Sequence, residues 1–302
     1  ISCCLYIALI YINHSSSGNI DLLQPSKINT DMQNFSIAYD ESGKITLVGT
    51  YQNMLMAFDE SGNKIWEFPS NGPFRELIVD SEKRKVYAGC EDRNLYILDL
   101  DSGKLINKID VQLRIYSIDV SEDSSLIAVS AGISAIKHYL ALYDGEGNKI
   151  FLKDVGSIAR KVAFNSDDSG IILGNNRAEM MLFDLEGNQL HKKKLNYEIT
   201  GMHMLDELKQ IAVLTKNTTY YLLNESFEQL ESHTYYGEGM TLTASKDLQY
   251  IGIGNREGDF YMVNRSGELL YTKKLENAIS SILITDEKTC VASLGKIIYE
   301  LD

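Results

Sequence analysis

A short motif recurs along the chain: an apolar strand that ends in Asp or Asn, followed by a polar turn that usually contains Gly. It reads MLMAFDESGNK at 54–64, LYILDLDSGK at 95–104, LALYDGEGNK at 140–149, MMLFDLEGNQ at 180–189, YYLLNESFEQ at 220–229 and FYMVNRSGEL at 260–269. Successive Asp or Asn positions lie 40 or 45 residues apart, and IIYELD repeats the strand once more, up to Asp302. A period of about 40 residues is typical of a protein built from repeated structural units.

Three further strands recur in step with this motif, so each unit contains four. We name them a to d in chain order: the quoted strand is c, strands such as FSIAYD and ITLVGT precede it as a and b, and strands such as KIWEF follow its turn as d. Short runs of β-branched, aliphatic and aromatic residues between turns are typical of antiparallel strands. Four such strands in about 40 residues predict a β-propeller blade. The expected fold class is all-β, a seven-bladed propeller of four-stranded antiparallel blades.

The strand count also predicts how the ring closes. The sequence holds seven a, b and c strands but only six d strands after them. The segment IDLLQPSKI at 20–28 stands directly before the first a strand, and we expect it to complete the last blade, formed by 280–302. Pro25 suits an outer strand because a free edge does not need its missing N–H. The propeller is expected to span 20–302.

The turn after strand c requires a residue that tolerates a positive φ, which is cheap only for Gly or Asn. Five copies place Gly there: Gly62, Gly103, Gly147, Gly187 and Gly267. The fifth copy has Phe227 instead. We expect this departure to weaken that turn.

Parts of the repeat resemble known propellers. AFDESGNKIWEF at 57–68 resembles the repeat of the pyrroloquinoline-quinone (PQQ)-like propellers, whereas VSEDSSLIAVSA at 120–131 and FNSDDSGIILGN at 164–175 are similar to loops of WD-repeat propellers. The resemblance covers about residues 20–302 and implies the propeller superfamily, without resolving the subfamily. That superfamily includes quinoprotein enzymes, outer-membrane assembly scaffolds and interaction platforms.

The resemblance to PQQ-like propellers raises the question of a cofactor. The quinone enzymes stack their cofactor on a Trp and ligate calcium, usually beside a vicinal disulfide. Here Trp66 falls in an outer strand, where we expect it to pack between outer strands and lock a blade, and the adjacent Cys3 and Cys4 lie outside the propeller. No Cys or His cluster has zinc-site spacing. We therefore expect no cofactor, no metal and no catalytic residues.

Charge and cysteine content limit the partners and the chemistry. The net charge of −13 disfavours nucleic acid as a partner, because an acidic surface repels phosphates. Cys90 and Cys290 fall at opposite ends of b strands in blades separated by blade 1, so we expect free, mostly buried thiols.

The first residues differ in character from the propeller. Residues 1–12, ISCCLYIALIYI, are apolar and uncharged, and 13–19 form a polar linker. We interpret 1–12 as the end of a membrane anchor or a signal segment; a buried N-terminal strand is the alternative. The absence of Lys and Arg beside this run favours the outward side of a membrane, with a secreted or cytoplasmic protein as alternatives.

One face of the ring carries the candidate binding residues. The d–a and b–c connections of propellers meet at the channel mouth, and the d–a entries there carry Arg75, Arg114 and Arg160, followed in later units by Tyr197, Tyr235 and Tyr236. Arg and Tyr are enriched among interface anchors. The alternative is that these arginines only pair with neighbouring acids such as Glu76 and Glu198.

The b–c connection of blade 3 is four residues longer than its counterparts. This insertion is expected to bring Ile133 and Ile136 to the same face. Exposed apolar residues there favour contact with a partner, although folding back onto blade 4 is an equal alternative.

These observations predict a non-catalytic interaction platform, tethered outside a membrane, that binds a protein or small ligand through the channel-mouth face as a monomeric propeller. One alternative is an enzyme, either a quinoprotein-like oxidoreductase or a carbohydrate-active propeller. The other is the sensor domain of a larger membrane protein.

Overall fold

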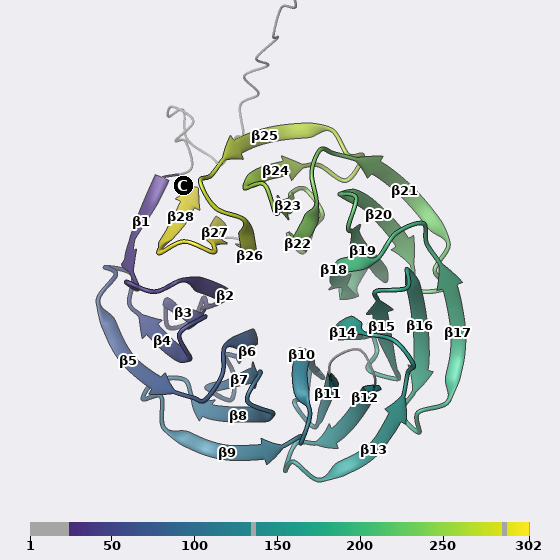
Figure 1. Ribbon diagram of the computed structural model, residues 1–302, viewed down its shortest axis with the longest axis horizontal. Coiled ribbons are helices and arrows are strands. Elements are labelled where there is room, and N and C mark those ends of the chain that lie inside the picture. The colour runs from purple at the N-terminus through teal and green to yellow at the C-terminus, as the bar shows by residue number, and fades with distance from the viewer. Residues whose placement is uncertain (1–23, 134–136, 286–288, 302) are drawn as a thin grey trace, which may run out of the picture.

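The computed structural model describes residues 24–133, 137–285 and 289–301, and it confirms the predicted fold. Seven four-stranded antiparallel sheets are arranged as blades around a central axis (Figure 1). In six blades the strands follow chain order from the axis to the rim. In the seventh blade the order from the axis to the rim is β26-β27-β28-β1. Apart from turns and loops, the described residues form only strands and one short 3₁₀ turn, η1 (Asp206–Leu208).

The inner half of each blade contains the a and b strands. The a strands lie nearest the axis: β2 (Asn34–Asp40), β6 (Phe74–Asp80), β10 (Arg114–Val120), β14 (Ala159–Phe164), β18 (Ile199–Leu205), β22 (Gly239–Ala244) and β26 (Ile279–Ile284). The b strands follow: β3 (Ile45–Thr50), β7 (Lys85–Cys90), β11 (Leu126–Ile133), β15 (Gly170–Asn175), β19 (Gln210–Thr215), β23 (Ile251–Asn255) and β27 (Thr289–Ser293).

The outer half of each blade contains the c and d strands. The c strands carry the repeated motif: β4 (Met54–Phe58), β8 (Asn94–Asp99), β12 (Lys137–Asp144), β16 (Glu179–Asp184), β20 (Thr219–Asn224), β24 (Asp259–Val263) and β28 (Ile297–Leu301). The d strands run along the rim toward the next blade (Figure 1): β5 (Lys64–Pro69), β9 (Leu105–Asp110), β13 (Lys149–Asp154), β17 (Gln189–Lys194), β21 (Gln229–Thr234), β25 (Leu269–Lys274) and β1 (Gln24–Asn29).

The ring closes as the strand count predicts. β1 pairs antiparallel with β28, with Gln24 opposite Glu300 and Pro25 opposite Tyr299, so one end of the chain completes the blade made by the other. Pro25 lies on the free outer edge, where no ladder hydrogen bond is lost. Residues 20–23 of the predicted closing segment fall outside the described residues.

The hydrophobic core is divided among the blade interfaces. The described residues form seven apolar clusters, and each cluster joins the facing surfaces of two neighbouring blades. The cluster between blades 7 and 1 contains Ile28 of the closing strand together with Ile298 of β28 and Met56 of β4. Closure therefore adds a packed interface as well as strand pairing.

Close packing between blades depends on complementary large and small residues. Gly174 of β15 leaves room for Ile199 at the start of the next blade, since a Cβ on Gly174 would lie 2.7 Å from the Ile199 Cγ2. Between blades 5 and 6 the order is reversed: Leu214 occupies the b strand and Gly239 begins the next a strand. The exchange keeps the volume of the interface similar although both residues change, as close-packed interiors require.

The rim strands that precede blades 1 to 6 also cover the c–d turn of the next blade. Trp66 of β5 is 8% exposed, donates its indole N–H to the Leu100 carbonyl at 2.8 Å, and lies against Gly103, where the backbone φ is +67°. Phe151 covers Gly187 in the same way. The prediction that Trp66 locks neighbouring blades is confirmed.

The turn without glycine in blade 5 is compensated by burial. Phe227 adopts a φ of 60° and is 1% exposed, with its ring centroid 5.3 Å from that of His191 on the preceding rim strand. Its side chain thus enters the core between blades 4 and 5. The left-handed conformation costs about 1–2 kcal/mol, whereas burial of a Phe is worth about 3–5 kcal/mol.

The cysteine prediction is confirmed, and the prediction for the N-terminal segment is not tested. Cys90 and Cys290 are free and buried, and burial raises the pKa of the Cys90 thiol to about 12. Across the described ranges, the structure contains no helix long and apolar enough to cross a membrane. The predicted anchor or signal at 1–12 and the linker at 13–19 lie outside those ranges.

Deleting residues 1–29 is expected to lower the melting temperature sharply, because it removes β1 and the Ile28 contacts from the closing blade. Deleting only 1–19 is the matched control and leaves β1 in place. Differential scanning calorimetry of both proteins checks this. Equal melting of the two would contradict the closure mechanism.

Replacing Phe227 with Gly is expected to destabilise the protein by about 2 kcal/mol, because the lost burial exceeds the relieved backbone strain. Urea unfolding followed by fluorescence measures the difference. Phe227→Leu, which retains the strained turn and much of the apolar volume, should cost less. A Gly variant more stable than the wild type would show that strain dominates.

Candidate functional site

The d–a and b–c connections lie at the same end of the ring, which we call the mouth face. Here every a strand contains a β-bulge near its start. A bulge inserts one residue that has no partner on the neighbouring strand and re-aims its side chain. We call these seven residues the bulge ring: Phe35, Arg75, Tyr116, Arg160, Thr200, Met240 and Ser280.

The bulge ring is uneven. In blades 1–4 it alternates aromatic residues and arginines, whereas blades 5–7 contribute Thr, Met and Ser. The Arg75 guanidinium lies 4.6 Å from the centroid of the Phe35 ring, and Tyr51 meets Phe35 edge to face at 5.3 Å while staying 48% exposed. Phe35 and Tyr51 were not predicted from the sequence, because the bulge that aligns Phe35 with Arg75 and the ring contact with Tyr51 appear only in the paired strands.

Acidic residues partly neutralise the predicted arginines. Arg75 and Arg114 both pair with Glu91, Arg114 at 3.3 Å, and the Glu91 side chain is only 12% exposed. The partner suggested by the sequence for Arg75 was Glu76, and that assignment is wrong because Glu76 turns toward the axis and pairs with Lys161.

A second series of ion pairs crosses blades 4 to 6. Arg160 bonds Glu198 at 2.8 Å, as the sequence suggested. The series continues through Lys216 and Glu238 to Arg256, with N–O distances of 3.8, 3.7 and 3.2 Å. Exposed pairs of this kind contribute about 0–1 kcal/mol each, so they organise the surface more than they stabilise the fold.

The predicted tyrosines have different environments. Tyr197 is 50% exposed and Tyr236 is 76% exposed. Tyr235 is half-buried, donates its hydroxyl to the Gly267 carbonyl at 2.7 Å and stacks on Tyr261, and burial raises its pKa to about 12. Tyr235 therefore joins blade 5 to blade 6, while Tyr197 and Tyr236 are available at the surface.

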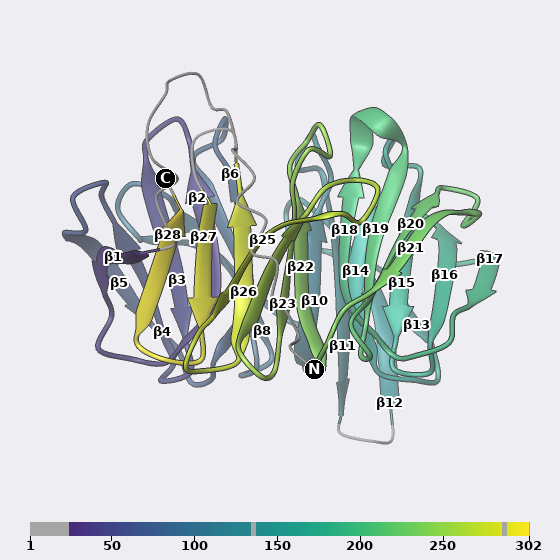
Figure 2. The same ribbon diagram turned by 90° about the horizontal axis from the view of Figure 1, so that it is seen from above.

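The insertion in blade 3 lengthens a hairpin at the mouth face. β11 and β12 each contain eight residues and reach beyond the other blades at this end (Figure 2). Ile133 ends β11 and is 53% exposed, so this residue does not fold back onto blade 4. Ile136 lies outside the described residues.

Polar side chains also meet near the central axis. The Glu76 carboxylate of blade 2 accepts bonds from the Ser117 hydroxyl and the Ile118 N–H of blade 3, and from the Lys161 ammonium of blade 4. The Ser117 hydroxyl in turn accepts the Val162 N–H at 3.2 Å. These bonds satisfy backbone groups on the inner edges of the next a strands, which have no neighbouring strand to pair with.

Asp119 of β10 and His203 of β18 are ionisable, and each lies two positions after the repeat position that Glu76 occupies in β6. Burial raises the pKa of Asp119 to about 7, although the hydrogen bond from the Phe164 N–H favours the charged carboxylate. The negative charges of the nearby Glu76 and Asp206 raise this pKa further. Burial, together with Lys161, lowers the pKa of His203 to about 4. Both side chains lie deep within the ring yet keep part of their surface exposed. The members of this polar cluster occupy repeat positions that small or apolar residues fill in most other blades.

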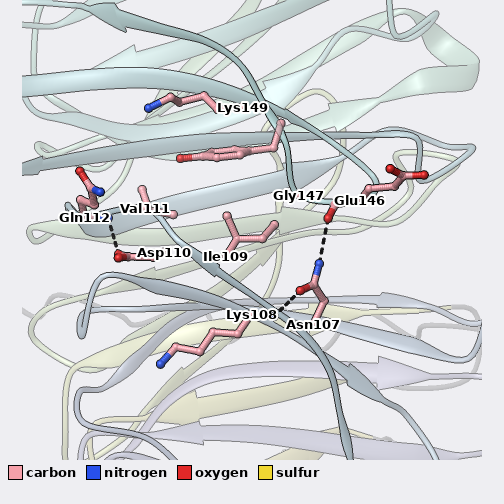
Figure 3. Close-up of a pocket in the computed structure, with 10 residues that line it drawn as sticks. Asn107, Lys108, Ile109, Asp110, Val111, Gln112, Glu146, Gly147 and Lys149 are labelled. Atoms are coloured by element: carbon pink, nitrogen blue, oxygen red, sulfur yellow. Dashed lines mark hydrogen bonds between the residues drawn. The ribbon is translucent and has the colours of Figure 1, made fainter.

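A polar groove of about 250 Å³ lies at the rim between β9 and the c–d turn of blade 3 (Figure 3). Asn107 donates its amide N–H to the Glu146 carbonyl across it at 2.9 Å. Lys108, Asp110 and Lys149 give it mixed charge. Other rim strands form the same kind of seam with the next c–d turn, so we assign this groove to blade packing.

The fold is shared widely among solved structures. The structure of Raptor from Chaetomium thermophilum matches with a TM-score of 0.80 at 11% identity, covering 94% of this chain and 29% of that one. No protein-family model matches the sequence, and no curated protein matches it significantly. At this identity the likeness shows the propeller fold alone. This fold commonly serves as an interaction platform.

Replacing Asp119 with Asn is expected to change the pH dependence of stability. The folded-state pKa of Asp119 lies above its ordinary value of 3.8, so its contribution to stability is lost as the pH rises from about 4 to about 7, by at most about 1.4 kcal/mol per pH unit. Asn keeps an acceptor for the Phe164 N–H without titrating. The melting temperature of the variant should therefore rise relative to wild type as the pH rises from about 4 to about 7.

The variant-minus-wild-type difference isolates Asp119 from His203. His203 loses its contribution as the pH falls from 6.5 toward 4, but it does so in both proteins. Asp119→Ala leaves the Phe164 N–H unpaired, so this variant should be less stable than Asp119→Asn at every pH. A difference between Asn variant and wild type that is constant with pH would contradict the raised pKa.

Proposed function

We propose that this propeller is a non-catalytic interaction platform that binds a protein or small ligand at the mouth face. The observation that carries the proposal is the bulge ring, which aims one side chain per blade at this face and places aromatic residues and arginines together in blades 1–4. Such residues provide most of the binding energy at protein interfaces. The exposed Tyr51, Tyr197 and Tyr236 extend the same surface outward.

The bonding near the axis supports a structural role for the inner carboxylates. Glu76 holds three donors from two other blades, and Asp119 holds the Phe164 N–H at 2.6 Å. A carboxylate acting in acid–base or nucleophilic chemistry must reach its substrate, and these oxygens are occupied by the blades they join. The bonding of these carboxylates therefore favours a platform over a carbohydrate-active enzyme. The peripheral position of Trp66, bonded to Leu100, likewise argues against stacking on a quinone.

We also propose that the propeller is held outside a membrane as a monomer, by the apolar segment at 1–12 followed by the polar residues 13–19. The support is the composition of these segments and the lack of flanking basic residues. The strand nearest to this segment in the described structure is β1, which lies at the rim as the outer strand of the last blade. A sensor domain within a larger membrane protein would use the same arrangement.

Peptides selected against the intact protein from a random displayed library are expected to bind the mouth face. A double variant, Tyr51→Ser with Tyr236→Ser, should weaken such peptides by about tenfold or more, because truncated interface anchors commonly cost more than 1 kcal/mol. The control is Ile65→Ser with Leu190→Ser, two rim residues that are 45% and 60% exposed. Isothermal titration calorimetry measures both.

Peptides that lose affinity for the rim variant and not for the mouth variant would contradict the proposed face. Stoichiometric calorimetric binding of PQQ with calcium would contradict the non-catalytic assignment in favour of the quinoprotein alternative.

A further inference from the structure

Arginine and lysine are distributed differently over this propeller. The chain has eight arginines, and two of them, Arg84 and Arg265, lie in turns at the end opposite the mouth face. The other six belong to connections or strand starts of the mouth face: Arg75, Arg93, Arg114, Arg160, Arg177 and Arg256. Arg offers a planar, bidentate donor pair for carboxylates and is less strongly hydrated than Lys, so its concentration on one face indicates recognition more than solubility.

Four of these residues form one patch over blades 2–4, which we call the arginine sector: Arg93, Arg114, Arg160 and Arg177. Backbone contacts connect them. The Arg93 carbonyl accepts the Val111 N–H at 3.0 Å at the entry to blade 3, and Arg114 pairs with Gly132 in the neighbouring strand.

The contacts continue across blade 3 to blade 4. Gly132 pairs with His138, whose environment includes the charge of Arg177. The Asn176 N–H then bonds the Ile158 carbonyl at 2.9 Å, two residues before Arg160. The sector thus surrounds the base of the β11–β12 hairpin.

The sector keeps unused donors. Among the described residues no ion pair involves Arg93 or Arg177, and both are exposed. The side chains of Arg114 and Arg160 are 57% and 43% exposed and contact one acid each. Burial lowers the pKa of His138, so this residue adds no charge near neutral pH.

The acids of the same sector are already engaged. Glu91 is shared by Arg75 and Arg114, and Asp92 accepts the Tyr96 hydroxyl at 2.6 Å. Asp110 accepts the Gln112 N–H at 2.9 Å, and Asp154 accepts the Gly156 N–H at 2.8 Å. Each of these acids thus has a partner within the chain, whereas no ion pair among the described residues involves Arg93 or Arg177.

The opposite end of the ring has the reverse character. The a–b turns of blades 3 to 5 gather acidic residues: Glu122, Asp123, Asp167, Asp168, Asp206 and Glu207. Burial, together with repulsion from the neighbouring acids, raises the pKa values of Asp168 and Asp206. An acidic ligand is repelled from that end and directed to the mouth face.

We propose that the arginine sector binds an acidic polypeptide segment, a proposal that rests on the mouth face being the binding surface. Carboxylates of the segment pair with Arg93, Arg177 and the free edges of Arg114 and Arg160. Ile133, which is 53% exposed, and the half-exposed Tyr116 provide apolar contacts between these charges, so a segment that alternates acidic and apolar residues fits best.

The test measures fluorescence anisotropy of a labelled peptide of alternating Glu and Leu against the full chain at low salt. The double variant Arg93→Asn with Arg177→Gln is expected to weaken binding by about tenfold or more. Asn suits position 93 because the φ there is 79°. The charge-matched control, Lys44→Gln with Lys64→Gln, removes two exposed cations at the opposite end and should leave affinity unchanged. Raising the salt toward about 0.3 M should weaken binding to the wild type, since counter-ions screen exposed charges.

Absence of peptide binding, or an equal loss in the control, would overturn the proposal. Equal or tighter binding of an oligo-deoxythymidine that depends on the same arginines would assign the sector to nucleic acid and overturn the polypeptide ligand. If library peptides bind the mouth face but are not acidic and are insensitive to Arg93 and Arg177, the platform stands and the acidic ligand is rejected. The single variant Arg177→Gln, which leaves the strained turn at 93 untouched, should show a smaller loss in the same direction.

Discussion

No blade of this propeller can bury both of its faces alone, and the rest of the structure depends on that constraint. Each of the seven apolar clusters is made by two blades, so each blade is stable only between two neighbours. An open array would leave two apolar faces and a free strand edge in water. The pairing of β1 with β28 removes both defects at once, because it completes the last blade and places Ile28 in the cluster between blades 7 and 1.

The same constraint explains the locks at the rim and the polar cluster near the axis. At the rim, Trp66 and Phe151 each close the seam to the following turn, and Phe227 fills the corresponding place from the turn itself. Near the axis, Glu76 and Ser117 cap N–H groups of the next inner strand, which has no partner strand on that side. Charged and hydroxyl side chains that would suggest chemistry in another setting here connect blades.

Because the blades hold one another rigidly, side chains at the mouth face are presented in fixed positions. The inner-strand bulge supplies one such position per blade, and the sequence is free to vary there without disturbing the cores. Blades 1–4 use this freedom for Phe35, Arg75, Tyr116 and Arg160, while blades 5–7 do not. Aromatic residues and arginines at the bulge positions are therefore concentrated on one side of a ring whose backbone is nearly repetitive.

Period, turn residues and strand patterns are local properties that recur along the chain, and from them the strand order, the number of blades, the closing strand and the burial of Trp66 could be predicted. The sequence also indicated the mouth face and several of its arginines. Only the tertiary structure decided which acid each arginine meets, that Tyr235 joins two blades, that Phe227 is held by burial, and that Glu76 and Lys161 meet near the axis. Those contacts join residues about 15 to 85 positions apart in different strands or blades, and their geometry follows from bulges and blade angles that no local pattern encodes.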